Sequence, residues 1–234
     1  MEANQFIGLI KFFRNEDFLD KLCSGLFYCN SPEKYRLNNQ EGIGDPMESC
    51  IHSYRLSRND SEIVLEINGH ALTGVESLTL HNSNNRDSWL HCWFELRIPS
   101  DQEALDSLNA NIERMKKEFG DNFAFIPAPK LKPLVELIQK HSEHPLYCDS
   151  VKYSSNSSDW GNLCKSTKFS YQNEYRFLFG ECNPHSLVHY EFSIPQEDIQ
   201  ELILKNSEIK LMDSSDGTEW FVLRPNQLDK VSMV

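Results

Sequence analysis

Three side chains capable of chemistry, Gln172, Glu174 and Arg176, stand at alternate positions where an aromatic run begins. Successive residues of a β-strand point to opposite faces, so these three would share one face while the aromatic side chains between them face a core. A carboxylate, an amide and a guanidinium on one face could form a functional site. Glu174 and Arg176 could equally be an internal ion pair on a surface strand, and spacing alone leaves both readings open.

The Gln-x-Glu pattern favours chemistry at a ribosyl carbon. A carboxylate that accepts a hydrogen bond from a ribose hydroxyl places negative charge where positive charge develops in an oxocarbenium-like transition state. An amide two residues earlier, on the same face, can orient the incoming nucleophile. A glycosidase with two carboxylates would need a distant partner for Glu174, such as Asp45 or Glu48.

Other kinds of site are disfavoured by residue type and spacing. The close histidine pairs, His141 with His144 and His185 with His189, lack further ligands at an established spacing, so we expect no metal site. Cys92 and its neighbouring histidine would point to opposite faces of a strand, which favours core packing for the thiol over a nucleophilic role. The glycine-rich loops that hold nucleotide phosphates are absent from the sequence.

Composition indicates an acidic globular protein. The chain has 234 residues, 39% of them hydrophobic, and a net charge of −12, which disfavours non-specific binding to nucleic acid or anionic lipid. Seven cysteines without a C-x-x-C pair favour reduced thiols. With no apolar run long enough to span a membrane, we expect a cytoplasmic protein, or an effector delivered to a host cytosol.

Strands and helices are predicted in irregular order, which is typical of an α+β fold in one domain covering residues 1–234. Asn15 is the expected N-cap of the first helix, and Ser100 or Asp101 is the expected N-cap of the helix at 101–119. The loop 30–46 is a candidate lid, since long loops within a domain are often functional. The predicted strands cover residues 6–13, 26–29, 48–56, 62–67, 88–96, 123–126, 146–153, 175–179, 186–192 and 219–224, and the longer helices cover 101–119 and 131–141.

Several motifs occur in a characteristic order along the chain. They are F-I-G-L-I-K-F-F at 6–13, G-D-P-M-E at 44–48, L-H-C-W-F at 90–94, V-K-Y at 151–153 and F-S-Y-Q-N-E-Y-R at 169–176. This order resembles a bacterial and phage domain family with a strand–helix–strand opening, an N/D-P-x-E loop, C-W and V-x-Y strands and an E-x-E-Y-R ending. The resemblance covers about residues 6–180, and residues 181–234 would extend the same domain.

That family is in turn similar to the ADP-ribosyltransferase superfamily, and its opening to that of DNA-targeting ADP-ribosyltransferase toxins. The resemblance implies a split β-sheet core with flanking helices, NAD as a substrate and no metal. It makes Glu174 the catalytic glutamate and Gln172 its upstream helper. Carried over residue by residue, the other roles fall to Lys11 or Arg14 for the first-strand NAD contact and to Tyr28 or Tyr35 for the aromatic on nicotinamide, with Ser166 nearest to the strand serine. Arg176, on the same strand face as Glu174, can orient that carboxylate and keep it ionised.

The chain also departs from the family pattern. Its first strand has Lys or Arg where many relatives have His, no S-T-S triplet begins a strand, and Gln172 replaces the usual first glutamate of E-x-E. In the superfamily this position relates to the choice of acceptor, so Gln172 argues against arginine as the acceptor.

The implied activity is transfer of ADP-ribose from NAD to a macromolecule (RNA, DNA or protein) by a toxin, phage-defence protein or effector. An antitoxin or regulatory protein would be an expected partner. Two alternatives stay open. One is NAD hydrolysis at the same site, and the other is a non-catalytic binding or inhibitor module whose acidic surface mimics nucleic acid.

Overall fold

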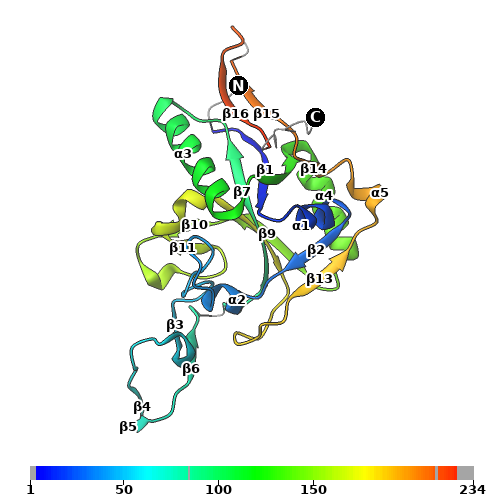
Figure 1. Cartoon of the computed structure of the whole chain (residues 1–234). Coiled ribbons are helices and arrows are strands. Elements are labelled where there is room, and N and C mark those ends of the chain that lie inside the picture. Colours follow the sequence, from blue (N-terminus) through cyan, green and yellow to red (C-terminus); the bar gives the residue numbers. More distant parts are fainter. Residues whose placement is uncertain (1–3, 84, 214–215, 226–234) are drawn as a thin grey trace, which may run out of the picture.

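A six-stranded antiparallel sheet forms the centre of the computed structural model, which describes residues 4–83, 85–213 and 216–225 (Figure 1). The chain therefore has the α+β architecture expected from its sequence. In spatial order, the sheet consists of β14 (Leu204–Lys205), β8 (Asn122–Pro127), β1 (Phe6–Phe13), β7 (Trp89–Arg97), β12 (Glu174–Phe179) and β9 (Leu146–Ser150).

Helices and small strand pairs surround this sheet. The helices are α1 (Glu16–Cys23), α2 (Pro32–Arg36), α3 (Gln102–Phe119), α4 (Ala128–His141) and α5 (Gln196–Ile199), with 3₁₀ turns η1 (Leu56–Arg58), η2 (Ser157–Asp159) and η3 (Thr167–Gln172). The strand pairs are β2 (Leu26–Cys29) with β13 (Tyr190–Ser193), β10 (Lys152–Ser154) with β11 (Cys164–Ser166), β3 (His52–Arg55) with β6 (Ser77–Leu80), β4 (Leu65–Ile67) with β5 (His70–Leu72), and β15 (Ile209–Met212) with β16 (Glu219–Leu223).

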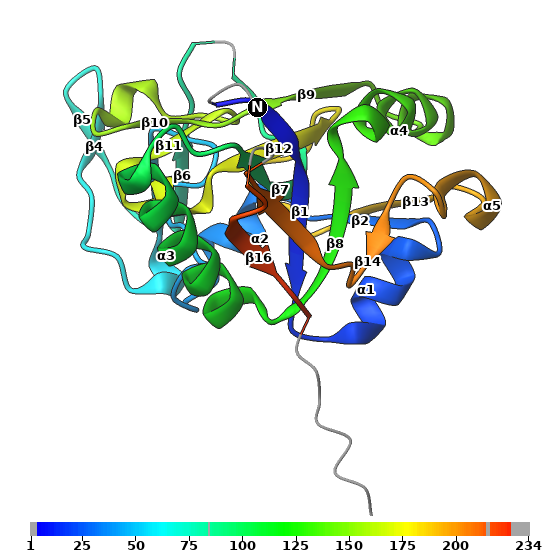
Figure 2. The same cartoon turned by 90° about the horizontal axis from the view of Figure 1, so that it is seen from above.

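Both faces of the central sheet are covered. On one face α1, α4 and the β2–β13 pair bury a core that includes Leu9, Trp93 and Phe177. On the other face α3, η3 and the β15–β16 pair pack on Ile10 and Phe94. Figure 2 shows α3 and α4 on opposite sides of the central strands. Neighbouring residues of β1 point to opposite faces of the sheet. Its apolar side chains therefore pack in both cores, Leu9 in one and Ile10 in the other.

The opening strand–helix–strand unit forms as predicted. The Asn15 side chain accepts a hydrogen bond from the Asp17 amide at 2.9 Å and caps α1. Gly25 follows the helix with φ +100°, and a Cβ at this position would lie 1.9 Å from the Ile194 carbonyl oxygen. Glycine is therefore required where α1 turns into β2.

Several predicted boundaries were wrong. The segment 48–56 forms a strand only over β3, and 62–67 only over β4, because both belong to small pairs that lie outside the central sheet. The predicted strand 146–153 divides at Val151, where β9 leaves β12 and β10 begins to pair with β11. The helix predicted from Leu131 begins at Ala128, since a proline is tolerated in a first helical turn. The predicted strand 186–192 forms only over β13, which begins at Tyr190.

No helix in the described part of the chain is both long and apolar enough to cross a membrane.

Candidate functional site

Strand β12 of the central sheet positions two of the predicted site residues. Glu174 lies opposite Phe94 of β7 and Arg176 opposite Cys92, on the same face of the sheet. Phe177 belongs to the core on the other face. The predicted alternation of polar and aromatic side chains in this strand is confirmed.

Gln172 reaches this face by a different route from the one predicted. It ends η3, and Asn173 then adopts a left-handed conformation with φ +37° before β12 begins at Glu174. The turn, and not strand alternation, brings the amide beside Glu174. The Q-x-E pattern therefore predicted correctly that Gln172 lies beside Glu174, but it was wrong to place both residues on one strand.

Four buried charged side chains meet at the start of β12 and form what we call the charge quartet: Glu48, Lys165, Glu174 and Arg176. The Lys165 ammonium lies 2.7 Å from Glu174 Oε1 and 3.3 Å from Glu48 Oε2. Arg176 lies 2.7 Å from Glu174 Oε2 through Nε and 2.8 Å from Glu48 Oε1 through Nη1. Two carboxylates and two cations alternate around a closed ring.

The quartet keeps its carboxylates ionised. Burial alone would raise the pKa of Glu174, but the charges of Arg176 and Lys165 lower it to about 2. Burial and the same two cations act on Glu48, whose pKa is also lowered. Burial alone would lower the pKa of Lys165, but the negative charges of Glu174 and Glu48 outweigh this effect and raise it. At neutral pH all of these groups are therefore charged.

Gln172 connects the quartet to the loop 30–46. Its Oε1 accepts a hydrogen bond from Lys165 at 3.0 Å, and its Nε2 donates to the Gly42 carbonyl at 2.7 Å. The loop is more structured than predicted, because it contains α2. Gln172 thus fixes the turn at Gly42 over the charged side chains.

Strands β1 and β7 separate beside the quartet. Their ladder ends at the pair Ile10–Phe94, although β1 continues to Phe13 alongside β8 and β7 begins at Trp89 alongside β12. Lys11 lies at this gap, where its ammonium donates to the Cys92 carbonyl at 2.8 Å. Burial lowers the pKa of Lys11. The Lys11 side chain of β1 thus reaches across the gap to the backbone of β7.

Two cavities meet at the gap. One, the charged cavity, has a volume of about 240 Å³ and contains the quartet together with Gln172, Gly42 and Trp93 in its walls. The other, the aromatic cavity, has a volume of about 460 Å³ and is lined by Phe18, Tyr28 and His91 among others. Lys11, Asn30 and Tyr35 line both cavities.

Asn30 presents an unsatisfied acceptor where the cavities meet. Its backbone pairs with Leu90 of β7 through hydrogen bonds of 3.1 and 2.8 Å, which fixes the residue beside the gap. Its side-chain nitrogen lies 3.4 Å from the Tyr35 hydroxyl. Its Oδ1 is buried and has no hydrogen-bond partner among the described residues. A buried acceptor of this kind is costly to leave empty, which favours a ligand with a donor at this point.

The structure brings most of the predicted site residues together. Lys11, Tyr35, Gln172, Glu174 and Arg176 line the charged cavity. Tyr28 lines the aromatic cavity, where its ring stacks on His189 at 4.3 Å between centroids.

Two other predicted residues lie elsewhere. Arg14 follows β1 and donates to the Glu118 carbonyl at the end of α3, and Ser166 ends β11. Neither is among the residues lining the two cavities. Of Lys11 and Arg14, the two alternatives for the first-strand contact, Lys11 is therefore the one that lies at the gap.

Sequence reasoning missed Lys165 and Asn30 as site residues and gave Glu48 only as a distant carboxylate. Lys165 lies on β11, which pairs with β10 and not with the central sheet. Glu48 lies in the turns before β3. The G-D-P-M-E motif was the one signal for Glu48, while no local pattern marks Asn30 or Lys165.

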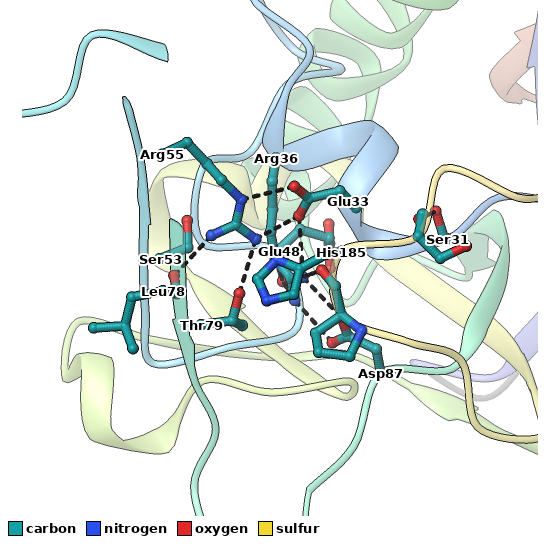
Figure 3. Close-up of polar contacts among 12 residues, drawn as sticks. Ser31, Glu33, Arg36, Glu48, Ser53, Arg55, Leu78, Thr79, Asp87 and His185 are labelled. Carbon is teal, nitrogen blue, oxygen red and sulfur yellow. Dashed lines mark hydrogen bonds and ion pairs between the residues drawn. The ribbon is translucent and has the colours of Figure 1, made fainter. Parts of the chain in front are cut away.

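A second buried ionic cluster fixes the segment that carries Glu48 (Figure 3). Arg36 donates to both carboxylate oxygens of Asp87 at 2.7 and 2.8 Å and, through Nε and Nη2, to the Glu48 carbonyl at 2.9 and 2.7 Å. Arg55 donates to both oxygens of Glu33 at 2.7 and 2.6 Å. Glu48 is therefore held by its backbone in this cluster and by its carboxylate in the quartet.

The chemistry available here is electrostatic. Burial raises the pKa of Cys92 to about 12, so its thiol is protonated at neutral pH and is a poor nucleophile. No group of three or more potential ligands for a metal occurs among residues 4–83, 85–213 and 216–225. An ionised carboxylate in a partly aromatic cavity can accept a hydrogen bond from a hydroxyl and stabilise positive charge.

No family model, no curated protein and no solved structure matched this chain in comparisons with known proteins.

Proposed function

We propose that the chain is an NAD-dependent enzyme that transfers ADP-ribose to a macromolecule. One observation carries the proposal: the ionised carboxylate of Glu174 lines a cavity that opens where β1 and β7 separate. That separation leaves β14–β8–β1 and β7–β12–β9 as two halves of the sheet beside the site. The same feature supports the ADP-ribosyltransferase-like split-sheet reading of the fold, and NAD would enter between the halves.

Glu174 acts in this mechanism without taking a proton. A general base works best with a pKa near the operating pH, whereas the pKa of Glu174 is about 2. Its carboxylate instead accepts a hydrogen bond from a hydroxyl of the nicotinamide ribose and stabilises the positive charge that develops at C1′. A carboxylate has about four lone-pair positions, so the contacts with Lys165 and Arg176 leave room for this bond.

The bond changes balance without a redox partner. The C1′–N bond of NAD breaks, and nicotinamide leaves as a neutral base with the electron pair of that bond. A nucleophile on protein or nucleic acid then forms a bond to C1′ and loses its proton to solvent. Water in place of the macromolecule would give NAD hydrolysis from the same site.

The two cavities match a ligand in two parts. Small-molecule sites typically span roughly 300–1,000 Å³. The aromatic cavity, at about 460 Å³, falls in that range, and the charged cavity, at about 240 Å³, adjoins it through Lys11, Asn30 and Tyr35. We assign the nicotinamide ribose to the charged cavity and the remainder of NAD to the aromatic cavity. Gln172 holds the turn at Gly42 and acts as a positioning residue.

A specific observation favours a second candidate, a non-catalytic binding module. Each carboxylate oxygen of Glu48 and Glu174 already contacts a cation within the chain, as in a purely structural ion network. Such a module would keep its partner binding when Glu174 is changed and would not consume NAD.

The test is incubation of the purified protein with NAD labelled in the adenylate half. We expect release of nicotinamide, measured by chromatography, and transfer of label to protein or nucleic acid supplied with it. Glu174→Gln keeps the shape and removes the charge, and should lower both signals at least about 100-fold. Nicotinamide release without label transfer assigns hydrolysis. Absence of NAD binding by calorimetry, or activity that survives Glu174→Gln, overturns the proposal.

A further inference from the structure

A projecting arm lies apart from the charged cavity and consists of residues 52–80. Its base is the β3–β6 pair and its tip is the β4–β5 hairpin. Figure 1 shows the tip extending away from the rest of the molecule. No residue of the arm lines the charged or the aromatic cavity, so binding at the arm would not depend on the proposed enzymatic function.

The base of the arm is anchored by buried polar contacts (Figure 3). Arg55 of β3 pairs with Glu33 of α2 at 2.6 Å, and both side chains are almost fully buried. The same guanidinium donates to the Leu78 carbonyl at 2.7 Å, across the base of the arm. These bonds connect α2, β3 and β6, so the base of the arm is attached to the body by buried contacts.

The tip, by contrast, contributes no residue to the two core clusters of the described part of the chain. Leu65 pairs with Leu72 and Ile67 with His70, so apolar side chains from both strands share one face. Ile67 is 55% exposed and Leu72 is 43% exposed. Within the described residues β4 pairs only with β5, which leaves an unpaired edge on each strand. An isolated two-stranded hairpin is marginally stable in water, and a third strand paired with its edge would extend the apolar face and stabilise the hairpin.

The charge of the arm selects the kind of partner. Its acidic residues are Asp60, Glu62, Glu66 and Glu76. Both of its arginines are paired, Arg55 with Glu33 of α2 at 2.6 Å and Arg58 with Asp60 at 2.5 Å. The arm thus has exposed carboxylates at Glu62, Glu66 and Glu76 as well as an exposed apolar face. A second copy of this chain would bring together two bodies of net charge −12, which repel each other. A positively charged partner is attracted to the same surface.

We propose that the arm binds an extended segment of a basic protein, which adds a strand to the edge of the β4–β5 hairpin. In such a segment apolar residues alternate with Lys or Arg, because alternate side chains of a strand point to opposite faces. The apolar side chains cover Ile67 and Leu72, and the cations lie near Glu66 and its acidic neighbours. Main-chain hydrogen bonds to the edge supply the register.

The probe is a labelled peptide of about eight alternating Lys and Val residues, the length of an ordinary strand. Binding to the full chain is measured by fluorescence anisotropy at low and at moderate salt. We expect saturable binding that salt weakens. A peptide of the same sequence with alternate backbone nitrogens methylated keeps its charge but cannot add as a strand, and it should lose binding.

Variants locate the contact. Glu66→Lys combined with Ile67→Ser changes two exposed residues of the tip and should weaken binding about tenfold. Glu113→Lys, on an exposed side chain of α3, makes the same charge change away from the arm and should have little effect. Circular dichroism checks that each variant is folded. Equal binding of the methylated peptide, or equal weakening by Glu113→Lys, overturns the proposal. Self-association of the free protein that the tip variant abolishes would also overturn it, by assigning the arm to a second copy.

Discussion

Glu48 and Glu174 contact the same two cations, although Glu48 lies in a turn before β3 and Glu174 begins strand β12 of the central sheet. Lys165 lies 3.3 Å from Glu48 and 2.7 Å from Glu174, and Arg176 lies 2.8 and 2.7 Å from them. Two like charges can be buried side by side because two opposite charges separate them. The turn carrying Glu48 is thereby tied to the strand carrying Glu174, and loss of either carboxylate leaves an excess of buried positive charge.

The first prediction concerns the role of Glu174 in turnover. Glu174→Gln should lower the rate of nicotinamide release about 100- to 1,000-fold, the usual cost of removing one group that stabilises transition-state charge. Single-turnover kinetics with saturating NAD separates this loss from weaker binding.

Glu95→Gln is the matched control for that change. Glu95 is also buried and pairs with Arg97 at 2.6 Å, but it does not line either cavity. Its substitution should reduce stability while leaving the turnover of folded protein within about twofold. Equal losses of turnover in the two variants would show that Glu174 has only a structural role.

The second prediction is a loss of stability in acid. The pKa of Glu174 falls from its ordinary value of 4.5 to about 2 on folding, so the unfolded chain binds its proton first as the pH is lowered. The stabilisation by this group is complete above about pH 5 and is lost as the pH falls towards 2, on the order of 3 kcal/mol in all. Urea unfolding at several pH values measures it. In Glu174→Gln the free energy of unfolding should depend less on pH across this window, and an unchanged slope would contradict the assignment.

The third prediction concerns the pair formed by Arg36 and Asp87. Arg36→Met should lower the free energy of unfolding by about 3–5 kcal/mol, because it leaves a buried carboxylate without its cation. Asp87→Asn should cost less, since Arg36 keeps its bonds to the Glu48 carbonyl. A double-mutant cycle monitored by urea unfolding isolates the coupling. A coupling near zero would show that the bidentate contact does not stabilise the segment that carries Glu48.

Strand alternation and helix capping could be predicted from the sequence because both depend on near neighbours. The faces of Glu174 and Arg176, the cap at Asn15 and the length of α3 all follow from local periodicity or side-chain chemistry. The charge quartet does not. Lys165 lies on a strand outside the central sheet and Glu48 lies in a turn, so only tertiary packing places them beside Glu174.

Short elements were predicted least well. The segments around β3 and β4 have enough β-branched and apolar residues to suggest strands, but they pair outside the central sheet and end early. Gln172 shows the same limit. A left-handed residue, Asn173, moves it out of the strand pattern, and a single asparagine gives weak warning of such a turn.

The last prediction separates ligand binding from stability at Asn30. Its Oδ1 is buried at the point where the two cavities meet and has no donor within residues 4–83, 85–213 and 216–225, so the folded chain carries a desolvation cost that a bound ligand would remove. Asn30→Leu removes that cost but also the 3.4 Å contact with the buried Tyr35 hydroxyl, so it should change the free energy of unfolding by no more than about 1 kcal/mol, while weakening NAD binding at least about fivefold. Calorimetry and urea unfolding measure the two effects. Asn109→Leu, on the exposed side of α3, serves as the control and should change neither by much. Loss of stability in Asn30→Leu with unchanged NAD affinity would mean that Oδ1 supports the fold and not a ligand.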